Sequence, residues 1–146
     1  MGLRRPALWF RRAVVVAVGI SATGYASSVA SRGPAERAAA NRIASELGTR
    51  NVYVIADDPT FQNNYPGSSA VLSRAGLTVH DCDRTGGRLD CFPWVGMSPG
   101  KVLGPFAVEV RWGRERGGLS GYGARTRYLA FFGVVFPIRD VFEWVT

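Results

Sequence analysis

The sequence predicts an α+β fold, in which an antiparallel sheet of about five strands carries one N-terminal helix on its face. Three segments support this prediction: a helical pattern at residues 34–47 and two strongly apolar strand patterns at residues 106–112 and 126–136. A signal or anchor helix precedes them in residues 1–30. The chain of 146 residues leaves room for one further domain, in residues 31–146.

The first 30 residues carry the pattern of an export signal. A basic front precedes the apolar stretch Ala13–Ile20, and Ser28-Val29-Ala30 has the small-x-Ala form of a signal-peptidase site. Residues 13–30 are also about long enough to cross a bilayer as an uncleaved helix. Whether the helix is cleaved or retained, the arginines before the apolar stretch would keep the N-terminus in the cytoplasm; they are Arg4, Arg5, Arg11 and Arg12. The sequence predicts an exported protein, either secreted or anchored, and leaves that choice open.

The charge of the exported part argues against a nucleic-acid partner. The whole chain carries 18 basic and 11 acidic residues, a net charge of +7. Four arginines lie in residues 1–30, so residues 31–146 carry 14 basic against 11 acidic residues, a net charge of +3. The high isoelectric point therefore belongs in part to the targeting segment.

The helix at residues 34–47 is predicted by its ends and its spacing. Pro34 suits the first helical position, Glu36 favours the positive N-terminal end, and Gly48 suits the C-terminal stop. Its apolar stripe consists mostly of small residues, namely Ala35, Ala39, Ile43 and Leu47. Such a helix can lie close to a sheet.

Strands and connections follow the helix. Residues 51–56 are apolar on both faces, which predicts an interior strand. Residues 60–67 and 97–105 are predicted to be loops, and residues 68–76 a short helix. Residues 90–95 are predicted to form an edge strand, because Pro93 has no N–H for a second neighbouring strand.

The C-terminal half supplies the expected core and a last helix. The two apolar strands contribute the core candidates, which are Phe106, Trp112, Phe132 and Phe136. After Pro137, apolar residues recur at helical spacing and predict a short terminal helix, through Ile138, Val141, Phe142 and Val145.

A hairpin is predicted around Gly86-Gly87, between the only two cysteines, Cys82 and Cys91. A two-residue turn makes the numbers of cross-strand partners sum to 173, so Cys82 faces Cys91 and Val79 faces Trp94. The cysteines then form a non-hydrogen-bonded pair, whose side chains are close enough for a disulfide. Export and the even number of cysteines favour the same bond.

A zinc site is the weaker alternative for this segment. His80 and the two cysteines, with Asp81 or Asp83, supply enough ligands, but their spacing matches no usual zinc pattern. We therefore assign no metal site and no cofactor from the sequence.

An enzyme would have few groups to use. Asp57 and Asp58 follow an apolar strand, a position where α/β proteins often carry acids that bind metals or transfer protons. His80 is the only histidine. A small exported hydrolase or metal-dependent enzyme would need His80 together with Asp57, Asp58 or Asp81. The simpler interpretation is a solvated Asp-Pro turn and a surface histidine, with no catalytic residue assigned.

Arginines gather around the glycine-rich loop at residues 113–127. Arginine forks and glycine N–H groups can hold phosphates or carboxylates. The candidate binding residues for an anion, a lipid headgroup or a partner protein are Arg111, Arg114, Arg116, Tyr122, Arg125 and Arg127. The alternative is a solvated hairpin tip. Together with the export signal, this loop predicts a non-enzymatic accessory or interaction module of the cell envelope, with the membrane and an envelope protein as its expected partners.

Overall fold

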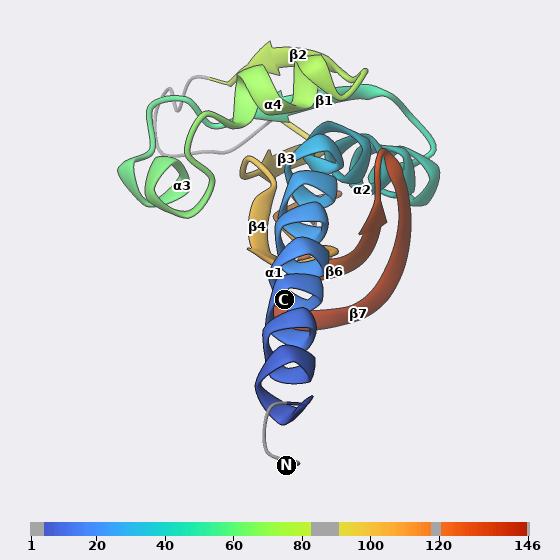
Figure 1. Ribbon diagram of the computed structural model, residues 1–146. Coiled ribbons are helices and arrows are strands. Elements are labelled where there is room, and N and C mark those ends of the chain that lie inside the picture. Colours follow the sequence, from blue (N-terminus) through green and yellow to red (C-terminus); the bar gives the residue numbers. More distant parts are fainter. Residues whose placement is uncertain (1–4, 83–90, 118–120, 146) are drawn as a thin grey trace.

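The computed structural model describes residues 5–82, 91–117 and 121–145 (Figure 1). These residues form helices and a mixed seven-stranded sheet, which confirms the α+β prediction with a larger sheet. The strands lie in the order β2-β1-β3-β5-β6-β7, and β4 pairs with β5. In chain order the elements are α1 (Arg5–Ala30), α2 (Arg32–Leu47), β1 (Asn51–Val54), α3 (Pro59–Asn64), α4 (Ser68–Arg74), β2 (Thr78–Asp81), β3 (Trp94–Met97), β4 (Lys101–Gly104), β5 (Ala107–Glu115), β6 (Gly121–Phe131) and β7 (Val134–Val145).

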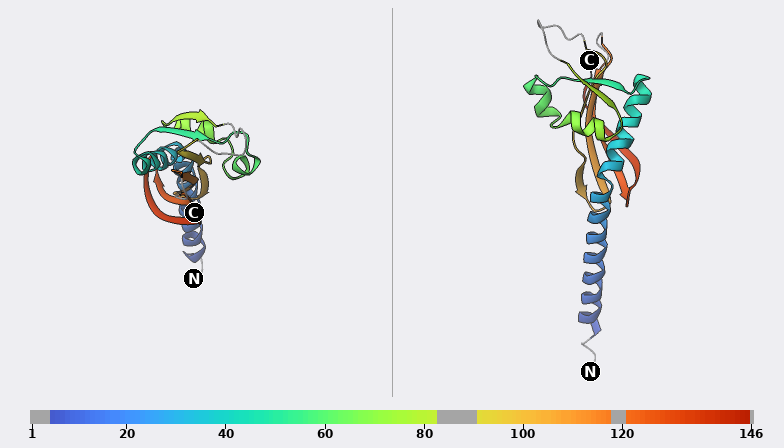
Figure 2. Two further views of the ribbon diagram at one scale, coloured as in Figure 1. Left: turned by 180° about the vertical axis from the view of Figure 1, so that it is seen from behind. Right: turned by 90° about the horizontal axis from the view of Figure 1, so that it is seen from above.

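The N-terminal helix α1 stands out from the domain as a stalk (Figure 2, right). Its residues Leu8–Ala30 form a stretch of 23 residues with a mean hydropathy of 1.6, long and apolar enough to cross a membrane. The helical hydrogen bonding does not stop at its end. Ser31 donates to the carbonyl of Ser27, and Ala35 donates to the carbonyl of Ser31. The chain therefore passes from α1 into α2 through a change of direction without an intervening loop.

Helix α2 confirms the helix predicted for residues 34–47. It ends at Gly48, which adopts the left-handed conformation (φ 73°) that glycine accepts without a steric penalty. The predicted stripe packs on the sheet, where Ala35, Ala39 and Ile43 are fully buried. Small side chains thus allow the close approach of helix and sheet.

Both strands that flank the cysteines pair with β1 rather than with each other. β1 is the predicted interior strand, and it runs parallel to β2 and β3. Val79 lies beside Val52, and Trp94 lies beside Tyr53, so the predicted pairing of Val79 with Trp94 is wrong. The edge position predicted from Pro93 is also wrong, since β3 lies between β1 and β5. The turn at Gly86-Gly87 lies outside the described residues.

Other elements differ from the sequence prediction. The expected loop at residues 60–67 begins with α3, whose N-terminal N–H groups are capped by Asp58. The expected loop at residues 97–105 contains β4, and most of the glycine-rich loop belongs to β5 and β6. The predicted terminal helix is wrong, because this segment is β7, which pairs along its length with β6.

Of the four predicted core residues, Trp112 is central and the others lie at one end. Trp112 is completely buried, and its indole N–H donates to Thr126 Oγ1 at 2.9 Å. Phe106 is half-buried, whereas Phe132 and Phe136 are 62% and 54% exposed, so their assignment to the core is wrong. All three phenylalanines lie in or beside the turns that meet α1.

Candidate functional site

Arg111 of β5 and Arg125 of β6 are direct cross-strand partners on the face of the sheet opposite α2. Two like charges at this spacing repel unless an anion lies between them. Glu143 of β7 supplies that anion, with 2.6 Å from its Oε2 to Arg111 Nε and 3.0 Å from its Oε1 to Arg125 Nε. One carboxylate therefore bridges two guanidinium groups.

A surface hollow of about 360 Å³ opens over this pair; we call it the basic pocket. It is lined by Ser98, Pro99, Lys101, Glu109, Arg111, Arg125 and Glu143. Arg127, on the rim, is paired with Glu109 at 2.9 Å. Lining and rim together hold four cations, Lys101 and three arginines, against the two carboxylates of Glu109 and Glu143. The pocket thus keeps an excess of two positive charges.

Arg111 is held in place from several sides. Its Nη1 donates to the carbonyl of Asn64 at 3.3 Å, and its Nη2 to the side-chain oxygen of Asn64 at 3.4 Å. Its guanidinium lies 5.7 Å from the centre of the Tyr65 ring. Because Asn64 ends α3, this short helix positions the guanidinium over the pocket. A pre-positioned arginine loses little entropy when it binds an anion.

Arg125 is only partly covered by its ion pair with Glu143. Its side chain is 41% exposed, yet its Nε is buried and has no hydrogen-bond partner among the described residues. The carboxylate of Glu143 lies close to this atom but is not aligned to accept from it. Guanidinium groups bind carboxylates and phosphates through paired N–H donors. The pocket can therefore bind an anionic group between Arg111, Arg125 and Lys101.

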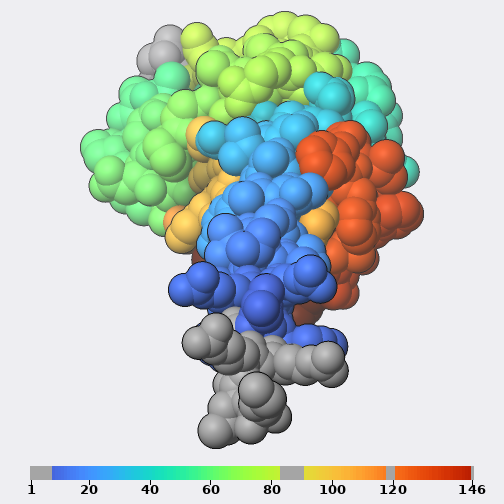
Figure 3. Space-filling model, in the orientation of Figure 1, coloured from blue at the N-terminus to red at the C-terminus, as the bar shows by residue number. Residues whose placement is uncertain are grey.

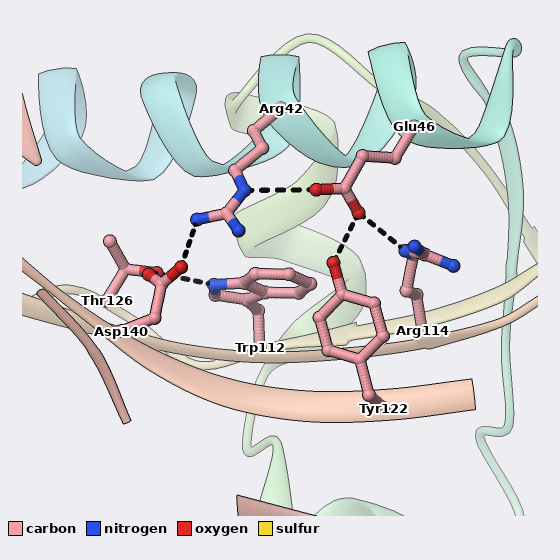
Figure 4. A network of polar contacts seen from close by, with 7 residues as sticks. All are labelled: Arg42, Glu46, Trp112, Arg114, Tyr122, Thr126 and Asp140. Carbon is pink, nitrogen blue, oxygen red and sulfur yellow. Dashed lines mark hydrogen bonds and ion pairs between the residues drawn. The ribbon is translucent and has the colours of Figure 1, made fainter. Parts of the chain in front are cut away.

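Two of the predicted binding residues lie on the other face of the sheet, in the network of Figure 4. Arg114 donates to Glu46 of α2 at 2.8 Å and lies over the ring of Tyr122, 4.4 Å from its centre. The hydroxyl of Tyr122 donates to the same carboxylate. Arg42 joins Glu46 to Asp140, which accepts from Arg42 Nη1 at 2.7 Å. The network fastens α2 to β5, β6 and β7.

The electrostatics of this network suit a structural role. Burial raises the pKa of Glu46, but hydrogen bonds from Tyr122, Arg42 and Arg114 outweigh burial and lower its pKa below the ordinary value. Burial and the hydrogen bond to Glu46 raise the pKa of Tyr122. The carboxylate therefore stays ionised and the phenol neutral near pH 7. Arg114 and Tyr122 have their polar groups engaged within the fold.

The six residues predicted for binding are thus divided among three places. Arg111, Arg125 and Arg127 lie together at the basic pocket, and Arg114 and Tyr122 lie under α2. Arg116 lines a separate hollow of about 310 Å³ with Leu47, Thr49, Phe92 and Pro93. The sequence contains a signal for this division. Side chains alternate between the two faces of a strand, and paired residues of β5 and β6 have numbers that sum to 236, so odd-numbered residues of both strands share one face. Arg111, Arg125 and Arg127 are all odd-numbered. The sequence did not indicate that Lys101, Glu109 and Glu143 would line the same pocket.

Asp58 and His80, two of the residues that an enzyme would need, make contacts within the fold. Asp58 caps α3, accepting from the backbone N–H of Thr60 at 2.8 Å. His80 lies beside Tyr53, with 5.5 Å between ring centres, and successive strand residues point to opposite faces, so His80 and Asp81 diverge. In residues 5–82, 91–117 and 121–145, no three His, Cys, Asp or Glu side chains are grouped to hold a metal ion.

The predicted disulfide between Cys82 and Cys91 is confirmed, with 5.9 Å between the two Cα atoms. Both sulfurs are bonded to each other, so neither is available as a thiolate ligand for the alternative zinc site. The bond joins the residue that follows β2 to the segment that precedes β3.

Comparison with family models, curated proteins and solved structures finds no match to this chain.

Proposed function

We propose that this chain is a membrane-anchored interaction module of the cell envelope, whose basic pocket binds an acidic segment of a partner protein. The observation that carries the proposal is the excess of cations at the pocket, where Arg111, Arg125, Lys101 and Arg127 surround only two carboxylates. Glu143 is shared between two guanidinium groups, so an incoming carboxylate finds donors that are already positioned.

The pocket chemistry favours binding over acid–base catalysis. Guanidinium groups stay protonated throughout the physiological pH range, so they supply charge and hydrogen bonds but exchange no proton with a substrate. The two carboxylates, Glu109 and Glu143, are both paired with arginines. A set of fixed cations around paired carboxylates recognises an anion by its shape and charge.

The anchored state is supported by the way α1 meets the domain. Ser27 and Ser28 of α1 are fully buried and hydrogen-bond to backbone groups of the sheet, through contacts to Ala130 and Gly104. The disulfide suits the oxidising side of a membrane. Helix and domain thus behave as one folded unit, with the domain on the exported side.

The binding proposal is tested with the full chain in detergent micelles. A hexaglutamate peptide serves as the probe for an acidic segment, inorganic phosphate serves as a second probe, and calorimetry measures both affinities. We expect peptide binding that weakens with salt, and at least about tenfold weaker binding when Arg111→Gln and Arg125→Gln are combined.

Arg37→Gln is the matched control, because Arg37 is an exposed arginine of α2 outside the pocket. Its affinity should equal that of the wild type. Equal binding by the double variant, or no peptide binding by the wild type, would refute the proposal. Binding of phosphate without binding of the peptide would replace the acidic segment by a phosphate-bearing ligand.

A further inference from the structure

Large apolar side chains are exposed at the end of the domain from which α1 emerges. We call this group the apolar end; its members are 37–62% exposed and comprise Leu103, Leu129, Phe131, Phe132, Val134 and Phe136. Apart from Phe132 at the tip, they alternate onto the face of the sheet that α2 leaves uncovered. In Figure 2 (right), the β4–β5 and β6–β7 turns lie beside the upper part of α1. Figure 3 shows the surfaces of α1 and β7 side by side. The apolar end therefore continues the apolar surface of α1.

Both turns at this end contain a phenylalanine in an unfavourable backbone conformation. Phe106 has φ 56° and Phe132 has φ 41°, and they are the two described non-glycine residues with positive φ. A bulky residue rarely adopts this region, where glycine or asparagine would be easier to accommodate. Aromatic side chains at the tips thus take the place of residues that would fold more easily, which points to a role for the rings outside the fold.

Four N–H groups of the two turns donate to α1 and to Ser31. Phe106 N–H donates to the Gly24 carbonyl at 3.0 Å, and Ala107 N–H donates to Ser28 Oγ at 2.9 Å. In the other turn, Phe132 N–H donates to Ser27 Oγ at 2.8 Å, and Gly133 N–H donates to Ser31 Oγ at 2.9 Å. If the turns were exposed to water, water molecules would accept hydrogen bonds from these N–H groups, and the bonds to α1 would not be needed. Lipid acyl chains offer no hydrogen-bond acceptors, so backbone groups among them must be paired within the protein.

The length of α1 places these turns at membrane depth. Gly24, level with Phe106, follows Arg12 by 12 residues, or about 18 Å along a helix. A hydrocarbon core is about 30 Å thick, so an upright helix with Arg12 at the inner boundary leaves Gly24 about 12 Å below the outer boundary. Counting from Leu8 instead leaves Gly24 about 6 Å below it.

A row of charged residues crosses the sheet above the apolar end. The register aligns Lys101, Glu109, Arg127 and Arg139 across β4, β5, β6 and β7. Two positions nearer to α1 on β5 and β6, Ala107 lies opposite Leu129, and beyond the register shift in β7 Leu129 lies opposite Phe136. Adjacent rows on one face are about 7 Å apart. Apolar tips beneath a cationic row match the layering of acyl chains and headgroups in a bilayer.

We infer that the domain is seated in the membrane: Phe106, Phe131 and Phe132 lie in the outer leaflet, and Lys101, Arg127 and Arg139 lie at its headgroups. The lipid acyl chains of the bilayer that α1 crosses cover the apolar end. This inference rests on the anchor of the proposed function, and it shares Lys101 and Arg127 with the basic pocket, whose Arg111 and Arg125 lie further from α1 along β5 and β6. The turns act as a collar around the end of the stalk.

The test measures the depth of a spin label on the full chain in lipid vesicles. The native cysteines form a disulfide, so a single introduced cysteine carries the label in each variant. Phe132→Cys and Val134→Cys probe the apolar end at two positions, both more than half exposed. Val16→Cys, at an exposed position of α1, is the membrane reference, and Asn63→Cys, at an exposed position of α3, is the water reference.

We expect the labels at residues 132 and 134 to be shielded from a water-soluble nickel relaxant and accessible to oxygen, as the label at residue 16 is. Nickel accessibility equal to that at residue 63 for both would overturn the inference. Carbonate extraction of the same vesicles separates this result from failure of the anchor. A chain that resists extraction with both labels in water keeps its anchor but has no seated collar, whereas a chain that is extracted refutes both.

Discussion

The hydroxyl of Ser27 in α1 donates a hydrogen bond to the carbonyl oxygen of Ala130 in β6, 103 positions further along the chain, at 2.8 Å. The same hydroxyl accepts from the N–H of Phe132. Ser28 plays the same part at the other turn, donating to the Gly104 carbonyl and accepting from Ala107. Two adjacent serines thus join the stalk to two turns at the same end of the sheet, the β6–β7 turn and the β4–β5 turn.

Replacing either serine by alanine should lower the free energy of unfolding, because it removes hydrogen bonds between α1 and the sheet. Ser27→Ala or Ser28→Ala removes the hydroxyl partner of one buried carbonyl and one partly buried N–H group, and an unsatisfied buried group costs about 1–3 kcal/mol. We expect a clear loss in the free energy of unfolding of the detergent-solubilised chain, measured with denaturant. Ser45→Ala, at an exposed position of α2, is the control and should change the stability little. Wild-type stability of both variants would mean that the contacts contribute nothing.

The mature protein should keep residues 1–30. Cleavage after Ala30 would remove Ser27 and Ser28, and with them hydrogen-bond partners of Gly104 and Ala107 at one turn and of Ala130 and Phe132 at the other. Ser28, inside the small-x-Ala motif, is fully buried in the folded protein. N-terminal sequencing of the membrane fraction should therefore start before Leu8. A stable, folded protein that starts at Ser31 would contradict the retained anchor.

The Glu46 network predicts an acid-sensitive contribution to stability. The pKa of Glu46 is lowered in the folded state, so its contribution is complete above the unfolded value of about 4.5 and is lost as the pH falls through the lower, folded pKa. Glu46→Gln should cost about 1–3 kcal/mol at pH 7, because three donors lose an ionised acceptor. Thermal unfolding measured below pH 5 should show a shallower decline for this variant than for the wild type.

Asp81→Asn, at an exposed position of β2, is the matched control for removing a carboxylate. It should keep the wild-type dependence on pH. Parallel curves for the wild type and Glu46→Gln from pH 7 to pH 3 would show that the network does not hold a lowered pKa.

The disulfide should contribute a modest amount of stability. Cys82 and Cys91 are nine positions apart, and a loop this short constrains the unfolded chain by about 2–3 kcal/mol. Reduction, or replacement of both cysteines by serine, should lower the free energy of unfolding by that amount. The double variant itself provides the check, because a reductant should leave its stability unchanged. A large effect of the reductant on that variant would place the loss elsewhere.

Local signals in the sequence were enough to predict α2, β1 and the long hairpin, because each carries its own ends and period. They could not predict the partners of β1, since parallel pairing with β2 and β3 depends on contacts distant in sequence. Where β6 pairs with β7, the register shifts twice, between Gly123 and Ala124 and between Arg127 and Tyr128. Such bulges interrupt the alternation of a strand, so Ile138, Val141, Phe142 and Val145 acquired helical spacing.

The candidate site was predictable in part for the same reason. Arg111, Arg125 and Arg127 share a face once the hairpin register is known, whereas Arg114 and Tyr122 fall on the other. Glu143 could not be placed while its segment was taken for a helix. Its role as a bridge between two arginines follows only from the strand β7.

The uninterrupted passage from α1 to α2 fixes the geometry of any encounter. A domain on a flexible linker samples many heights and directions above a membrane, whereas here Ser31 is the single residue between the two helices. In the proposed membrane-anchored state, rotation of α1 about its own axis would carry the basic pocket around a circle at a nearly constant height above the bilayer. The proposed partner is therefore one that presents its acidic segment close to the lipid surface, such as the juxtamembrane part of a neighbouring membrane protein.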